Sequence, residues 1–270
     1  MKINIAAGIL SILLMSCGNN DKVNSQKETA PNFQNKGHEL VHTMAQKVGT
    51  YDKLLEKNDV TYTYTYQTPD GKTDVATEKY LFKDELSYGA YTQHERTLPQ
   101  LQGLIEQGYN GTEFWLKHNE AILTDEDFIK KVQFNRPTNF YWFTMMQKLL
   151  DTGLKYEYIG EEIIKGNDYD IVKVTFDSNE NKATDTYQLY INKKTALVDQ
   201  FLFTVADFNI IDTPNLMKLE YETIDGFLLP TKRKYKKSTW NADETDAPWI
   251  LVNWSDIKFN NSFTKEDFEK

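Results

Sequence analysis

Hydrophobic and polar residues alternate with a period of two through most of the chain after residue 59. The run VTYTYTYQT places Tyr62, Tyr64 and Tyr66 on one face and threonines on the other, as in a half-buried β-strand. Further strand-like runs follow at short intervals up to Phe259. Because these runs do not alternate regularly with helices, the pattern predicts an antiparallel sheet rather than a parallel one.

Two dipeptides between these runs are strong hairpin signals. Asn110-Gly111 and Asp225-Gly226 each place a residue that tolerates positive φ before a glycine. Both therefore predict tight turns between neighbouring antiparallel strands.

The first helical segment covers residues 38–58. Its apolar side chains recur every three or four residues, from Leu40 to Leu55, which is the spacing of one helix face. Gly49 and Thr50 weaken the middle of this helix.

The second helical segment, residues 138–153, is apolar around most of its circumference. Thr138 or Asn139 would cap its start and Gly153 would end it. We expect this helix either to pack on the concave face of the sheet as core or to be a movable plug that lines an apolar ligand cavity.

The first seventeen residues have the parts of an export signal. Lys2 precedes an apolar run, Ile3 to Met15, that is shorter than the roughly 20 residues needed to span a bilayer. Residues 14–17, Leu-Met-Ser-Cys, resemble the lipobox of bacterial lipoprotein signal peptides. The resemblance implies that Cys17, the single cysteine, carries acyl chains such as palmitate; the alternative is an ordinary secretory signal with an incidental cysteine.

The chain divides into three parts on this basis. Residues 1–17 are the signal peptide and lipobox, residues 18–37 are a polar, flexible tether, and residues 38–270 are a single β domain.

Charge limits the partners of the domain. The 270 residues contain 31 Lys and Arg against 40 Asp and Glu, a net charge of −9, which argues against a nucleic acid partner. Membrane attachment would come through the Cys17 anchor instead. The local basic cluster TKRKYKK, residues 231–237, is interpreted as a solvated edge strand, with a contact to lipid headgroups as the alternative.

One motif suggests catalysis. His38-Glu39-Leu40-Val41-His42 matches H-E-x-x-H, in which two histidines bind zinc and the glutamate activates water. No third ligand follows at the spacing that zinc proteases use, and the motif lies beside the tether. We therefore predict a non-enzymatic protein without a cofactor or a metal and keep a zinc hydrolase through His38 and His42 as an alternative.

The chain resembles the LolA/LolB-type lipoprotein carriers of the cell envelope, in a branch found in Bacteroidetes-type bacteria. GYNGTEFWLKHNE is similar to a turn-plus-tryptophan hairpin of that family, and YETIDGFLLPTKRKY is similar to a late hairpin of its relatives. The resemblance implies a mainly β (α+β) fold: a strongly curved, unclosed antiparallel sheet, or half-barrel, wrapped around an N-terminal helix and an inner apolar helix.

The resemblance also implies an apolar hollow that accepts a lipid or a lipoprotein acyl chain. We expect the protein to lie in the bacterial envelope, on the outer membrane facing the periplasm, with a possible envelope protein partner. An interaction scaffold with a filled core is the second alternative. The side chains expected to line the apolar cavity are Tyr62, Tyr64, Tyr66, Phe140, Phe143, Met146, Phe201 and Phe203.

Replacing Cys17 tests the anchor. Cys17→Ser removes the thiol that would be acylated, so we expect an unprocessed or soluble form that no longer fractionates with membranes. Mass spectrometry of the parent should find acyl groups on the N-terminal residue. A parent without acyl mass, and a variant that still fractionates with membranes, would show that Cys17 is not an anchor.

Overall fold

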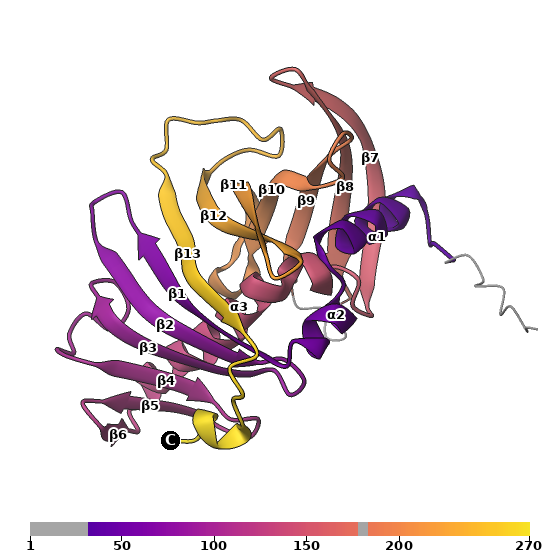
Figure 1. Cartoon of the computed structure of the whole chain (residues 1–270). Coiled ribbons are helices and arrows are strands. Elements are labelled where there is room, and N and C mark those ends of the chain that lie inside the picture. Colours follow the sequence, from indigo (N-terminus) through magenta and orange to yellow (C-terminus); the bar gives the residue numbers. More distant parts are fainter. Residues whose placement is uncertain (1–31, 178–182) are drawn as a thin grey trace, which may run out of the picture. The chain divides into compact units, whose positions relative to one another are not determined.

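One antiparallel sheet of thirteen strands dominates residues 32–177 and 183–270, which are the residues that the computed structural model describes. The strand order is β6-β5-β4-β3-β2-β1-β13-β12-β11-β10-β9-β8-β7 (Figure 1). The leader, Cys17 and most of the predicted tether lie outside the described residues, so the division of the chain into three parts stays a prediction.

The first six strands are β1 (Asp59–Gln67), β2 (Thr73–Leu81), β3 (Leu86–His94), β4 (Ile105–Tyr109), β5 (Phe114–His118) and β6 (Ala121–Leu123). The remaining strands are β7 (Leu154–Ile164), β8 (Asn167–Phe176), β9 (Thr186–Asn192), β10 (Val198–Val205), β11 (Ile210–Ile224), β12 (Phe227–Lys237) and β13 (Ile250–Phe259). Two short 3₁₀ helices are η1 (Ala206–Phe208) and η2 (Lys265–Phe268).

The sheet curves around a long helix, α3 (Glu126–Lys148), and does not close on itself (Figure 1). Strands β6 and β7 are its two edges. The helix α1 (Lys36–Val48) packs against β7 and β8, while α3 packs against β3, β4 and β5. The predicted fold class, an unclosed antiparallel half-barrel around an N-terminal helix and an inner helix, is confirmed.

The predicted N-terminal helix is broken into α1 and α2 (Tyr51–Glu56) at its weak point. Gly49 has a φ of 104°, and a Cβ atom there would lie 2.5 Å from the Phe227 ring, so only glycine fits the break. Thr50 then caps α2 by accepting a hydrogen bond from the backbone N–H of Lys53.

Helix α3 begins twelve residues earlier than predicted. Asp125 is its N-cap and accepts hydrogen bonds from the N–H groups of Asp127 and Phe128, so the predicted caps Thr138 and Asn139 are wrong. The first half of α3 is mostly polar and contains Pro137, so the spacing of apolar residues does not predict this part of the helix.

Among the described residues, no helix is long and apolar enough to cross a lipid bilayer.

The turn between β11 and β12 confirms one hairpin signal. Asp225 and Gly226 have φ angles of 50° and 88°, and Ile224 pairs with Phe227 across the turn. Both central residues therefore adopt the positive φ that a two-residue turn of the I′ kind requires.

Strand β12 carries the predicted basic cluster, and its interpretation as an edge strand is wrong. It pairs with β11 on one side and β13 on the other. Alternation directs Lys234 and Lys236 to the convex face, where their ammonium groups lie 5.1 and 4.4 Å from the Trp249 ring. Arg233 points to the concave face. Cation–π contacts therefore accommodate lysines that an edge strand would leave in solvent.

Two apolar clusters fill the space between the helices and the sheet. One joins α1 and the end of α3 to β7–β11, and the other joins α2 and the middle of α3 to β1–β5, β12 and β13. Tyr235 of β12 packs against both clusters. The core therefore has two halves that meet beneath α3.

A buried ion pair fixes α3 on the sheet. Nη1 and Nη2 of Arg136 donate to the two carboxylate oxygens of Glu78 on β2 at 2.9 and 3.0 Å, and both side chains are 0% exposed. Burial disfavours the charge on Arg136, but Glu78, with smaller contributions from Tyr91 and Tyr80, outweighs this effect, so the pKa of Arg136 is raised. Gly89 makes room for the guanidinium, because a Cβ there would lie 2.5 Å from Nη1.

The remaining bonds of Glu78 are also satisfied. Asn139 donates to Oε1 at 3.1 Å and the Tyr80 hydroxyl donates to Oε2 at 2.9 Å. Arg136 also donates to the Tyr91 hydroxyl at 3.1 Å. A buried pair is stable only with such additional hydrogen bonds.

We predict that Glu78→Gln destabilises the fold by about 3–5 kcal/mol, because it leaves the buried charge of Arg136 without a counter-ion. Urea unfolding measures the loss. The control is Lys130→Gln, which breaks an exposed ion pair with Asp127 on the same helix and should cost less than about 1 kcal/mol. Similar, small losses in both variants would contradict the assigned role of the buried pair.

Candidate functional site

The predicted ligand contacts around Phe143 form a packed aromatic cluster. The Phe143 ring lies 5.0 Å from that of Tyr62 and 5.1 Å from that of Trp254, and the Phe140 ring lies 5.2 Å from that of Tyr80. Tyr62, Phe140 and Phe143 are almost completely buried. These rings fill the space between α3 and the sheet, so a ligand there would have to displace them.

The other predicted contacts are divided. Met146, Phe201 and Phe203 belong to the cluster that includes α1. Tyr64, which is buried, belongs to the cluster that includes α2, and the half-buried Tyr66 packs against that cluster. The structure therefore divides the predicted residues between two clusters rather than placing them around one hollow. Their role in ligand binding stays a prediction.

Four aromatic side chains form a continuous row on the concave side. The rings of Tyr66 (β1), Tyr235 (β12), Phe203 (β10) and Trp142 (α3) follow one another at centroid distances of 6.4, 5.6 and 5.2 Å. Phe203 is buried, and the other three are partly exposed. The hydroxyls of Tyr66 and Tyr235 are hydrogen-bonded at 2.5 Å. We call this set the aromatic row.

The sequence predicts two members of the aromatic row, Tyr66 and Phe203, and misses the other two. Trp142 directly precedes Phe143 on a helix that is apolar nearly all round, so periodicity does not single it out. Tyr235 stands among lysines, but it shares one face of β12 with the buried Leu229, Thr231 and Arg233. That alternation is the signal that identifies it.

Arg233 is a cation enclosed by rings. Its side chain is 6% exposed, and its guanidinium carbon lies 3.8 Å from the ring centroid of Trp254 and 5.9 Å from that of Trp142. Burial lowers the pKa of Arg233 to about 10, although the neighbouring tyrosines oppose the shift. The group therefore remains charged at neutral pH.

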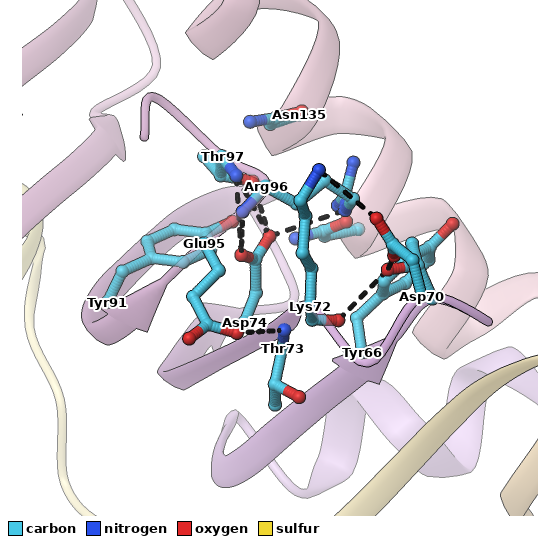
Figure 2. A network of polar contacts seen from close by, with 12 residues as sticks. Tyr66, Asp70, Lys72, Thr73, Asp74, Tyr91, Glu95, Arg96, Thr97 and Asn135 are labelled. Carbon is cyan, nitrogen blue, oxygen red and sulfur yellow. Dashed lines mark hydrogen bonds and ion pairs between the residues drawn. The ribbon is translucent and has the colours of Figure 1, made fainter. Parts of the chain in front are cut away.

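Arg96 lies at the other end of the row and has a carboxylate partner (Figure 2). Its Nε is 3.4 Å from Oδ2 of Asp74, and its guanidinium carbon is 4.0 Å from the Tyr66 ring centroid. Asp74 also accepts hydrogen bonds from the backbone N–H and the hydroxyl of Thr97 and from the N–H of Arg96. This network fixes the segment after β3 beside the aromatic row.

Two of the grooves on the described part of the domain are lined by residues of known position. One, of about 400 Å³, lies where β12 and β13 cease to pair and is lined by Glu222, Ile224, Lys232 and residues 253–257. The other, of about 310 Å³, lies between α1 and β7–β9 and is lined by Lys36, Leu40, Thr43, Glu161, Asp170, Ile191, Asn192, Lys193 and Ala196.

His38 and His42 lie one turn apart on α1 among aromatic neighbours. Their rings lie 5.6 and 5.2 Å from that of Phe33, and His38 stacks on Tyr156 at 4.7 Å. Burial, with a smaller contribution from His42, lowers the pKa of His38. Within residues 32–177 and 183–270, no group of three His, Cys, Asp or Glu side chains is arranged to hold a metal ion.

Comparison with known proteins places this arrangement in a known fold. A family described as a family of unknown function (DUF6503) matches residues 106–216. No curated protein matches the sequence significantly. A solved domain described as an outer membrane lipoprotein-sorting protein of Vibrio parahaemolyticus is 10% identical, with 87% of this chain and 96% of that chain covered and a TM-score of 0.50.

A LolA superfamily protein of Nitrosomonas europaea is 14% identical, with 82% of this chain and 98% of that chain covered and a TM-score of 0.46. A DUF1329 family protein of Desulfovibrio piger is also 14% identical, with 86% and 95% covered and a TM-score of 0.46. The chain has a LolA-like fold, as the sequence resemblance implies.

Zinc analysis tests the hydrolase alternative. We expect the purified protein, after dialysis against zinc and then against buffer, to retain far less than one zinc per chain, because protein zinc sites use three or four protein ligands. Elemental analysis measures the ratio. Stoichiometric zinc that is lost in His42→Ala would instead favour a metal site on α1.

Proposed function

We propose that this protein binds an acyl chain, of a lipid or of a lipoprotein, along the aromatic row of the half-barrel. A lipid on Cys17 would hold the protein on the outer membrane of the bacterial envelope, facing the periplasm. In this proposal the protein is a binding protein rather than an enzyme.

The partial exposure of the aromatic row carries the proposal. Tyr66, Tyr235 and Trp142 come from three different elements, and each is partly exposed. A guest that covers them gains about 0.8 kcal/mol for each CH₂ removed from water. Roughly eight such groups would contribute about 6 kcal/mol before the cost of ordering the chain is subtracted.

The fold supports the same ligand class. The structural neighbour with a TM-score of 0.50 is described as an outer membrane lipoprotein-sorting protein domain. Curved sheets that remain open leave a concave face available, and ligand sites are usually concave and mainly apolar.

A protein-binding scaffold with a filled core is the second candidate. The close contacts of Phe143 with Tyr62 and Trp254 favour it, because native interiors pack densely. Phe208 and Ile163, which are 61% and 73% exposed, would then contact an envelope protein partner. Such a scaffold would show no saturable binding of acyl chains.

Titration with a polyene fatty acid, whose fluorescence rises in apolar surroundings, tests the proposal. We expect saturable binding by the parent and roughly tenfold weaker binding by Trp142→Ala, equivalent to about 1.4 kcal/mol of lost contact. Circular dichroism should show that the variant is folded.

The matched control is Trp249→Ala. Trp249 is also partly exposed, but it lies on the convex face among Lys218, Lys234 and Lys236. Its removal should leave fatty acid binding unchanged. No binding by the folded parent would reject the proposal and favour the scaffold, whereas equal losses in both tryptophan variants would place the ligand elsewhere.

A further inference from the structure

Three buried hydrogen-bond donors without partners lie together on the concave face of β12 and β13. Thr231 Oγ1, Arg233 Nε and Trp254 Nε1 have no hydrogen-bond partner among the described residues, and each of these side chains is 6% exposed or less. Thr231 and Arg233 alternate on β12 and so share a face. Lys232 pairs with Asn253 of β13, so Thr231 and Trp254 are the next residues along the two strands, and the Trp254 ring lies 3.8 Å from the Arg233 guanidinium carbon.

The charge of Arg233 also lacks a counter-ion, unlike the other two arginines near α3. Arg136 pairs with Glu78 and Arg96 pairs with Asp74. Within the described part of the chain, no carboxylate forms an ion pair with Arg233. Its guanidinium lies against the rings of Trp254 and Trp142 instead. Proteins rarely bury a charge, or several donors side by side, without a partner.

The chemistry of the three groups defines the missing partner. All three donate hydrogen bonds and one is positively charged, so the complementary group has acceptor oxygens and a negative charge. A metal cation would be repelled, and a purely apolar group would leave the donors unsatisfied. We propose that Thr231, Arg233 and Trp254 bind the anionic head group, a carboxylate or a phosphate, of the ligand whose chain lies on the aromatic row.

The head-group site and the aromatic row adjoin each other. Arg233 lies 5.9 Å from the ring of Trp142, and Tyr235 follows Arg233 by two residues on the same face of β12. Trp254 also lines the groove where β12 and β13 separate. This inference rests on the proposed function, because it adds a head group to the same acyl ligand.

The experiment compares three ligands with the same chain, namely dodecanoate, dodecyl phosphate and dodecanol, by displacement of the neutral fluorophore aminoanthracene. We expect the parent to bind at least one of the two anions tenfold or more tightly than the alcohol. The better of the two identifies the head group as a carboxylate or a phosphate. Arg233→Met should abolish the preference by weakening anion binding while leaving dodecanol binding unchanged.

The matched control is Lys234→Met, which removes the same charge from the neighbouring position of β12 on the convex face, outside the groove that Trp254 lines. It should retain the preference for the anion. Urea unfolding adds a second measurement: without ligand, Arg233→Met should be at least as stable as the parent, because no counter-ion is left unpaired.

The outcomes separate this inference from the proposed function. Equal binding of anions and alcohol by the parent overturns the head-group site, leaves acyl binding intact, and indicates that water satisfies the donors. Binding of none of the three ligands rejects both. A large loss of stability in Arg233→Met, or a loss of dodecanol binding in that variant, would show that Arg233 is structural and overturn the inference.

Discussion

The bidentate ion pair between Glu78 and Arg136 determines where α3 lies, and the concave face depends on α3. Neither side chain reaches solvent, so sliding or rotating the helix would leave a charge buried and unpaired. Trp142 lies fewer than two turns further along the same helix, and its place above Phe201 and Phe203 follows from that anchorage. The ion pair therefore fixes the position of the apolar surface that α3 presents. Apolar packing alone would allow α3 more than one position.

The concave face combines aromatic surface with positive charge. Rings surround Arg233, and a ring covers Arg96, so cations are accommodated without making the face hydrophilic. The carboxylate of Asp74 is committed to Arg96 and to the turn that follows β3. Among the side chains that the structure describes, Arg233 is left without a carboxylate partner, and the proposed head-group site depends on this.

The period-two pattern from Tyr62 onward and the Asp225-Gly226 turn suffice to predict the antiparallel sheet, because each strand buries one face and local turn chemistry sets one register. The start of α3 at Glu126 was not predicted, since that half of the helix is mostly polar and its buried residues are only Val132 and Arg136, an arginine that needs Glu78, distant in sequence. The residues of the candidate site were harder to predict from the sequence than the helix. Trp142 and Arg233 differ from their neighbours only in what they contact in three dimensions, and the basic run around Arg233 has the same composition as an edge strand.

Strands β1 and β13 are neighbours in the sheet although nearly the whole domain separates them in sequence. Closing so long a loop costs chain entropy before strand pairing compensates for it, which slows folding. During synthesis β1 thus retains an unpaired backbone edge, flanked by Tyr62 and Tyr64, until β13 has emerged. Such an edge favours association between unfinished chains.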